Sequence, residues 1–135
     1  MNKEELKQIL PHREPMLLLD EAKLDGEISV GSYTVRGDEF FLQGHFPGNP
    51  VVPGVILCEM MAQSSCLLIS TDKKDVTPYL VGIKNMKFKG KVTPGDTIEF
   101  KTTKSSRKGP FYFIKGEGFV DEKLCISGEL SFALV

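Results

Sequence analysis

Residues 44–69 read GHFPGNPVVPGVILCEMMAQSSCLLI, a loop rich in glycine and proline followed by an apolar run. The loop holds too many prolines for regular structure, and Pro53 suits the first position of a helix because its missing N–H costs nothing there. In the run that follows, only Glu59, Gln63 and two serines are polar. A helix that is apolar on nearly every side is a buried one. We therefore predict a long central helix from about Pro53 to Ile69.

The rest of the chain predicts antiparallel strands that surround this helix. A short helix is expected over residues 2–10, a turn at Asp25-Gly26 and an exposed loop over 72–75. Strands are expected from Leu17, over 28–35, from Tyr79 toward Phe88, over 97–103, over 111–120 and over 124–134. Because short turns join consecutive strands, the sheet is expected to be antiparallel. We predict one α+β domain, residues 1–135, with five to six strands wrapped around one helix.

Composition and charge exclude several classes of partner. The chain has 17 Lys and Arg against 18 Asp and Glu, whereas nucleic-acid binding needs a surplus of positive charge. No apolar run reaches the ~20 residues of a membrane span, and no secretory signal is visible. With two histidines and no cysteine pair at ligand spacing, no metal site is expected. The odd number of cysteines indicates a reducing compartment, so we expect a cytoplasmic protein.

Glu59 is the sharpest chemical signal, because a carboxylate on a buried helix is costly unless it is paired, neutral or catalytic. Gln63 lies four residues on, on the same helix face and within hydrogen-bonding reach. Desolvation would raise the pKa of Glu59 and let it hold a proton near neutral pH, with Gln63 orienting it. The alternative is a helix end that reaches the surface, with both side chains simply hydrated.

His45 stands in the loop, where glycines and prolines restrict the backbone around it. A base on a rigid loop that faces an acid on a buried helix is what an acid–base enzyme needs. Gly54 is expected at the second helical position, where its N–H has no intrahelical acceptor and could polarise a carbonyl oxygen. The alternatives are an irregular loop without a chemical role and a glycine kept for close packing.

Two further groups of residues have a structural and a functional interpretation. His12-Arg13 is either a second functional pair or, preferably, a structural turn in which Arg13 pairs with an acid such as Asp20. A lysine series steps by two or three along a predicted strand: Lys84, Lys87, Lys89 and Lys91. The series is either a solvated strand face or a docking patch for an acidic partner.

These motifs resemble the (3R)-hydroxyacyl-acyl carrier protein dehydratases of the FabZ type, a family with the hot dog fold. The resemblance covers nearly the whole chain. Its residues are Leu10-Pro11-His12-Arg13 with Pro15, Leu17-Leu18 and Asp20; Gly44-His45-Phe46-Pro47-Gly48 with Pro50 and Pro53-Gly54-Val55; Glu59, Ala62 and Gln63; and Tyr79, Phe88 and Val92-Thr93-Pro94-Gly95-Asp96. One departure is Glu14, where the family usually carries an aromatic residue.

The resemblance implies a reaction and its residues. His45 would remove the proton at C2 of a 3-hydroxyacyl thioester, and Glu59 would protonate the departing 3-hydroxyl. The Gly54 amide would polarise the thioester carbonyl, and Gln63 would support Glu59. An un-ionised carboxyl would then face a neutral imidazole across a dry acyl tunnel. Neither a metal nor a redox cofactor is implied, because the carbonyl already acidifies the proton. Glu rather than Asp at the acid position favours plain dehydration without isomerisation.

The resemblance also implies partners and contacts. The substrate would arrive on the phosphopantetheine of acyl carrier protein, which is acidic, so the docking candidates are the lysine series with Arg107 and Lys108. Tyr79 matches a residue proposed to gate the tunnel, and Phe46 and Val55 fall beside the substrate. Each site would take its His and its Glu from different subunits. A homodimer is therefore the minimum unit, and a homohexamer of three dimers is expected.

Three alternatives stay open at this point. A hot dog thioesterase acting on acyl-CoA would use a carboxylate to activate water and would not need His45. An acyl-chain-binding module without catalytic activity would keep only the fold. A dehydratase of a specialised lipid or polyketide route would share its chemistry with the enzyme of fatty acid elongation. Residue types do not predict the preferred acyl length.

Overall fold

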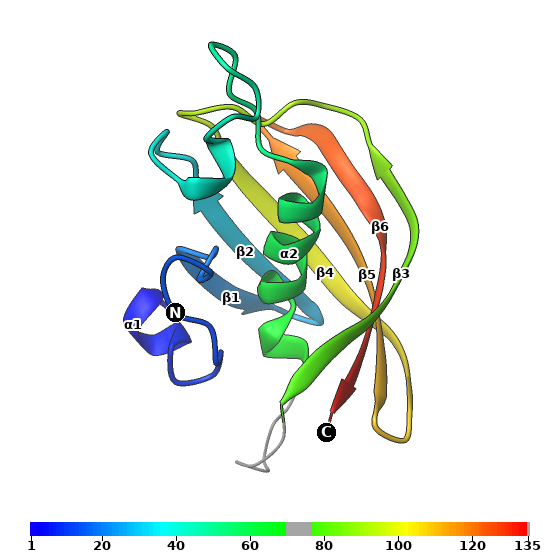
Figure 1. Cartoon of the computed structure of the whole chain (residues 1–135). Helices are drawn as coiled ribbons and strands as arrows, with labels where there is room; N and C mark the ends of the chain where they lie inside the picture. Colours follow the sequence, from blue (N-terminus) through cyan, green and yellow to red (C-terminus); the bar gives the residue numbers. More distant parts are fainter. Residues whose placement is uncertain (70–76, 135) are drawn as a thin grey trace.

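One curved antiparallel sheet is the frame of the molecule. The computed structural model describes residues 1–69 and 77–134, and its six strands follow the order β1-β2-β4-β5-β6-β3. The strands are β1 (Glu21–Asp25), β2 (Ile28–Thr34), β3 (Pro78–Phe88), β4 (Thr97–Lys108), β5 (Phe111–Val120) and β6 (Lys123–Leu134). In Figure 1 the sheet curves around one side of the central helix. Strands β1 and β3 form its two edges.

Helices cover the inner face of this sheet. They are α1 (Lys3–Leu6), α2 (Gly54–Ser64) and two 3-10 turns, η1 (Phe40–Leu42) and η2 (Cys66–Leu68). The predicted α+β architecture, an antiparallel sheet wrapped around one helix, is confirmed. The exposed loop predicted over 72–75 lies outside the described residues. No helix in the described ranges is long and apolar enough to cross a membrane.

The core lies between α2 and the inner face of the sheet. Along β4, Ile98, Phe100 and Thr102 are buried in alternation, as expected for a strand with one face inward. Their apolar members share one cluster with Met60 and Met61 of α2. Fully burying an apolar side chain of this size contributes about 1.5–3 kcal/mol, so this layer holds the helix to the sheet.

The central helix is shorter than predicted. α2 ends at Ser64 instead of Ile69, and η2 follows it. The hydroxyls of Ser64 and Ser65 donate to main-chain carbonyls of the helix, and such bonds compete with continuation of the helix. Pro53 is the residue before the first helical position rather than the first helical residue itself.

The N-terminal segment also differs from the prediction. α1 is a single turn, shorter than the predicted helix. Leu17–Leu19 do not lie in a strand, although all three side chains are buried. The Leu18 amide donates to Gln63 Oε1 at 2.8 Å rather than to a neighbouring strand. The first strand therefore begins only at Glu21.

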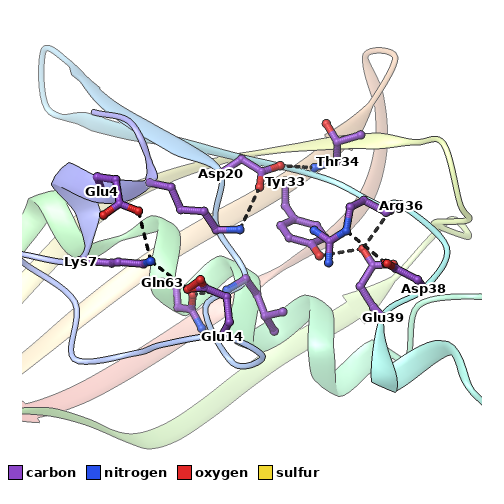
Figure 2. Close-up of polar contacts among 12 residues, drawn as sticks. Glu4, Lys7, Glu14, Asp20, Tyr33, Thr34, Arg36, Asp38, Glu39 and Gln63 are labelled. Atoms are coloured by element: carbon purple, nitrogen blue, oxygen red, sulfur yellow. Dashed lines mark hydrogen bonds and ion pairs between the residues drawn. The ribbon is translucent and has the colours of Figure 1, made fainter.

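A buried carboxylate anchors the segment that leads into the loop of His45. Glu39 accepts from the Tyr33 hydroxyl at 2.7 Å, from the Arg36 amide at 2.9 Å and from the Gly37 amide at 2.8 Å. Figure 2 shows Glu39 facing Tyr33 across this turn. Burial raises the pKa of Glu39, but the amide and hydroxyl donors outweigh it and lower the pKa to about 2.

We expect this anchor to make stability depend on acid pH. The folded pKa of Glu39, about 2, lies below its ordinary value of 4.5. Its stabilising effect is therefore fully present above pH 4.5 and is lost as the pH falls toward 2. Glu39→Gln does not titrate, so the difference in free energy of unfolding between the native chain and this variant should shrink over that range. Urea unfolding at fixed protein concentration measures it. A difference that stays constant from pH 6 to pH 2.5 would contradict the assignment.

Gly31 on β2 sets how closely α2 approaches the sheet. A Cβ atom at this position would lie 2.4 Å from Ser64 Oγ and 2.7 Å from Ser64 Cβ, an atom fixed to the backbone at the last residue of α2. Both distances are too short for any side chain, so the backbones can meet only where residue 31 is glycine. On β5, Gly116 meets Met61 Sδ at a comparable 2.6 Å, but a thioether is flexible and can turn aside.

We expect Gly31→Ala to lower the free energy of unfolding by about 1–3 kcal/mol, because overpacking forces the helix and sheet apart. Gly116→Ala is the matched control and should cost clearly less, because the side chain it meets can move. Urea unfolding at one protein concentration compares the two variants. Equal stability of Gly31→Ala and the native chain would refute the close-approach role.

Candidate active site

One cavity brings together several of the residues predicted for the site. It has a volume of about 260 Å³ and lies between the loop after α1, the second half of α2 and the start of β3. Its lining residues are Ile9, Leu10, Pro11, His12, Glu59, Ala62, Gln63, Cys66, Ile69, Thr77, Pro78, Tyr79, Leu80 and Phe132. Most of the lining is apolar, and two of its polar side chains, His12 and Gln63, contact Glu59. This combination is typical of a site that binds a small apolar ligand and acts on one end of it.

Gln63 is the best satisfied side chain of the site. It is 2% exposed, and its carbonyl oxygen accepts from the Leu18 amide at 2.8 Å. Its amide nitrogen donates to the Met16 carbonyl at 2.8 Å and to Glu59 Oε1 at 3.1 Å. The predicted contact between Gln63 and Glu59 is therefore present. These bonds tie the segment before β1 to the helix and hold the carboxyl group in one orientation.

His12 also contacts Glu59, which the preferred interpretation of the sequence missed. Its Nε2 atom lies 3.2 Å from Glu59 Oε1. The sequence contained a signal, because the same motif offered a second functional pair, but nothing in the residue pattern placed that loop against the helix. Only the folded chain brings residues 12 and 59 together.

Arg13 does not pair with Asp20 as predicted. Its guanidinium donates instead to the main-chain carbonyls of Lys7, Leu10 and His12, at 3.0, 3.0 and 2.6 Å. Five donors in one planar group let arginine close a loop in this way. Asp20 accepts from the Thr34 amide at 2.8 Å, as Figure 2 shows, and is tied to the strands.

The pKa of Glu59 runs opposite to the prediction. Burial raises it, but the hydrogen bonds from His12 and Gln63, with the charge that His12 can carry, outweigh burial and lower the pKa. The expected un-ionised carboxyl is therefore not the resting state of the single chain. The sequence showed the desolvation and the contact with Gln63, whereas the His12 donor comes only from the fold.

His45 has the geometry of a base. Its Nδ1 lies 3.0 Å from the Val51 carbonyl, and because a carbonyl oxygen only accepts, Nδ1 carries the hydrogen. The lone pair of the neutral ring is then on Nε2, free to take a proton. The ring of Phe46 stacks on the imidazole with 4.2 Å between centroids. The loop thus fixes both the tautomer and the orientation of His45.

The close-packing interpretation of Gly54 is confirmed, and its role toward a carbonyl oxygen stays a prediction. It is the first residue of α2 rather than the predicted second, and its amide has no intrahelical acceptor. A Cβ atom at this position would lie 2.9 Å from Phe88 Cε1. The missing side chain is therefore needed for packing against Phe88 of β3.

The single chain does not assemble all the predicted residues in one place. The described residues that line the cavity include Glu59, Gln63 and Tyr79, but not His45, Gly54, Phe46 or Val55. The latter four lie in or next to the loop at the N-terminal end of α2. Val55 is 76% exposed there, which is unusual for a helix of this apolar composition. Half of the predicted site is thus in the cavity, and the other half lies at the opposite end of the helix, where His45 and Gly54 are half-buried and Phe46 and Val55 are exposed.

The docking candidates fall into two groups. Lys84 and Lys87 lie on β3, and Lys89 and Lys91 follow it. Arg107 and Lys108 end β4, where Arg107 is level with Tyr112, Phe132 and the start of β3. From there to Lys87 is roughly 23 Å at the usual rise of a strand. Figure 1 places the turn between β4 and β5 at the far end of the sheet from the end of β3.

Glu14, which stands where the family that the sequence resembles usually has an aromatic residue, forms an ion pair. Its carboxylate lies 3.1 Å from Lys7 Nζ, which also lies 3.2 Å from Glu4. Figure 2 shows Lys7 between the two carboxylates. The pair closes the same loop that carries His12. Within residues 1–69 and 77–134, no three His, Cys, Asp or Glu side chains form a metal-binding group.

Comparison with sequences of known proteins identifies the family. The model of the FabA-like domain matches residues 10–129. A 3-hydroxyacyl-[acyl-carrier-protein] dehydratase FabZ of Clostridium perfringens is 42% identical over 99% of both chains. The protein of the same name from Staphylococcus haemolyticus is 40% identical, over 96% of this chain and 92% of its own. The similarity to these dehydratases therefore extends over nearly the whole chain and is not limited to the motifs noted in the sequence.

Comparison with solved structures supports the fold. A chain of the dehydratase heterocomplex ApeI:P from Xenorhabdus doucetiae superposes with a TM-score of 0.81 at 21% identity, over 96% of this chain and 90% of that chain. A hypothetical thioesterase with coenzyme A from Streptococcus pneumoniae gives a TM-score of 0.65 at 12% identity, covering 85% and 84% of the two chains. At these identities the likeness concerns the fold alone, and the predicted hot dog fold is confirmed.

Proposed function

The chain belongs to the FabA-like family, and from this premise we propose that it is a 3-hydroxyacyl-[acyl-carrier-protein] dehydratase of fatty acid elongation. The full-length identity of about 40% to proteins of that name supports the activity. The observation that carries the proposal in the structure is the carboxyl of Glu59, held by two donors in an apolar cavity. The substrate is a (3R)-hydroxyacyl chain, and the product is the trans-2-enoyl thioester.

The reaction moves two protons and breaks one C–O bond. His45 takes the proton from C2, and the electrons of that C–H bond form the C2=C3 double bond. Glu59 gives a proton to the 3-hydroxyl, which leaves as water with the electron pair of the C3–O bond. The Gly54 amide stabilises the negative charge that develops on the thioester oxygen. The step is redox-neutral, so it needs no redox cofactor.

Glu59 must hold a proton to act as the acid, although its pKa is lowered in the single chain. Closing the cavity with an acyl chain and a second protomer removes water from the carboxyl and raises its pKa. The same closure strengthens every hydrogen bond inside the site. Enzyme with protonated Glu59 and neutral His45 is then the form that reacts.

We propose that two copies complete one site by pairing their β3 strands. β3 is a sheet edge, bonded only to β6 among the described strands, and an apolar edge invites another strand. Its exposed apolar side chains are Tyr79, Leu80, Val81, Ile83 and Phe88. Pairing joins the two sheets and brings the His45 loop of one copy toward the Glu59 cavity of the other. A homohexamer of three such dimers stays a prediction.

Acyl carrier protein is the proposed partner, with substrate on its phosphopantetheine arm. The segment after β3 that carries Lys89 and Lys91 reaches the end of the His45 loop, because the Val52 amide donates to the Val92 carbonyl at 2.9 Å. This contact supports docking there. Arg107 and Lys108 are far from this end of the sheet in one protomer. They can contribute to docking only if the second copy of the dimer brings its own Arg107 and Lys108 to this end. Tyr79 remains the proposed gate of the acyl cavity.

We expect His45→Ala and Glu59→Gln each to lower kcat at least ~10²-fold without unfolding, because each removes one positioned proton-transfer group. The measurement follows 2-enoyl absorbance with a 3-hydroxyacyl thioester of acyl carrier protein. Circular dichroism and the urea midpoint control for folding. Near-native turnover in either variant would exclude the role given to that residue.

The same assay separates the competing functions when free thiol is measured beside the enoyl product. Thiol released without enoyl product would identify a thioesterase. Neither product, with the acyl chain still bound, would identify a binding module. Kinetics over a series of acyl lengths would then define the substrate of the elongation cycle or of a specialised route.

We expect the double change Val81→Asp with Ile83→Asp to dissociate the dimer and abolish turnover. Both side chains are exposed, by 55% and 54%, on the edge where the second copy pairs, and facing carboxylates repel. Leu24→Asp is the matched control, since Leu24 is also 54% exposed but lies on β1, the opposite edge. Sedimentation velocity measures both variants. A β3 variant that stays dimeric would rule out this interface.

A further inference from the structure

Glu59 is contacted on only one of its two oxygens. Nε2 of His12 lies 3.2 Å from Oε1, and the Gln63 amide nitrogen lies 3.1 Å from the same atom. Within residues 1–69 and 77–134, the hydrogen bonds leave the other oxygen, Oε2, without a protein partner. The side chain of Glu59, which lines the cavity, therefore has one anchored oxygen and one oxygen without a protein partner among the described residues.

The surroundings of His12 indicate which of its nitrogens carries hydrogen. Nδ1 is buried and has no hydrogen-bond partner among the described residues. An imidazolium would place an N–H at this atom without an acceptor, and buried N–H groups are rarely left unpaired. A neutral ring with its hydrogen on Nε2 leaves only a lone pair at Nδ1. This form donates from Nε2 to Glu59 Oε1, as Gln63 does.

We propose that His12 is a positioning residue that, together with Gln63, fixes the reacting proton of Glu59 on Oε2. The inference rests on the proposed role of Glu59 as the acid. A proton on Oε1 would meet two N–H donors, whereas Oε1 as a carbonyl oxygen accepts from both. The Oε2–H group is then the one that faces the substrate. During elimination its O–H bond breaks, the proton joins the 3-hydroxyl oxygen, and the C3–O bond breaks as water leaves.

No other basic side chain among the described lining residues can take the role proposed for His12. Among the described residues that line the cavity, His12 is the single basic side chain. The other titratable groups facing Glu59 are Cys66 from η2 and Tyr79 from β3. Arg13 and Lys7 belong to the same loop but are engaged elsewhere, with main-chain carbonyls and with carboxylates.

The loop holds His12 in place from both sides. The Arg13 guanidinium closes over three carbonyls, including that of His12 itself at 2.6 Å. Beyond it, the Met16 carbonyl and the Leu18 amide are tied to Gln63. Main-chain anchors on both sides therefore hold the segment that carries the imidazole.

Direct titration of Glu59 tests the inference without substrate. The carboxyl of ¹³C-labelled glutamate is followed by NMR against pH, with the Glu59 signal assigned by its loss in Glu59→Gln. His12→Ala removes a donor to the carboxylate, so the pKa of Glu59 should rise. His12→Gln places an amide nitrogen as many bonds from Cα as Nε2 and should restore the native pKa. His12→Asn is one bond shorter and should behave like His12→Ala.

Turnover supplies the second readout. We expect His12→Ala and His12→Asn to lower kcat about 10- to 10²-fold with little change in KM, because a misplaced acid acts mainly on the chemical step. His12→Gln should recover most of kcat. Lys7→Gln is the control from the same loop, and it should leave the Glu59 titration unchanged because Lys7 pairs with Glu14.

The outcomes separate the two proposals. An unchanged Glu59 titration in His12→Ala, or equal behaviour of the Gln and Asn variants, overturns the role of His12. If His12→Ala does not fold, the Gln and Asn pair still decides, because both keep a polar amide in the loop. Native turnover in Glu59→Gln would overturn the acid role of Glu59 instead, and the titration of Glu59 would not depend on that result.

Discussion

The structure depends on one constraint: a helix that must be buried carries two polar side chains that must find partners inside. α2 supplies the apolar layer that the sheet wraps, and Glu59 and Gln63 interrupt that layer. Gln63 resolves the conflict by bonding to main-chain groups of residues 16 and 18. Glu59 resolves it with His12 and Gln63. The same bonds hold the N-terminal segment against the helix. Glu59 and Gln63 therefore also determine where the cavity forms.

A second constraint is that a single protomer leaves a sheet edge exposed and the proposed site divided. The cavity with Glu59 opens beside β3, and β3 is an apolar edge with only one strand neighbour among the described residues. His45 and Gly54 lie at the other end of α2, with the exposed Val55 beside them. Neither half contains both of the proposed proton-transfer groups, His45 and Glu59. A second copy that pairs at β3 would cover the exposed edge and would also bring the two halves of the proposed site together. The proposed activity therefore depends on the proposed dimer.

The correspondence between pattern and structure is uneven for physical reasons. Alternation along β4 and β5 predicts their buried faces because a strand has a period of two that no tertiary contact can change. The end of α2 was predicted five residues too late, because hydroxyls of Ser64 and Ser65 bond back into the helix. Leu17–Leu19 look like a strand because they are apolar. Leu17 and Leu19 are instead buried in a cluster with Leu6 of α1. Leu18 is buried in the main core, and its amide donates to Gln63.

The sequence by itself determined the α+β architecture, the buried helix, the loop that fixes His45 and the Glu59–Gln63 spacing, because these follow from periodicity and from contacts four residues apart. Its motifs also carried the family resemblance. Only the tertiary structure decided the contact between His12 and Glu59 and the direction of the pKa of Glu59. His12 and Glu59 are 47 residues apart in the sequence. A contact over that separation depends on how the N-terminal loop packs against α2. Desolvation can be read from composition, whereas hydrogen-bond donors act only where the fold places them.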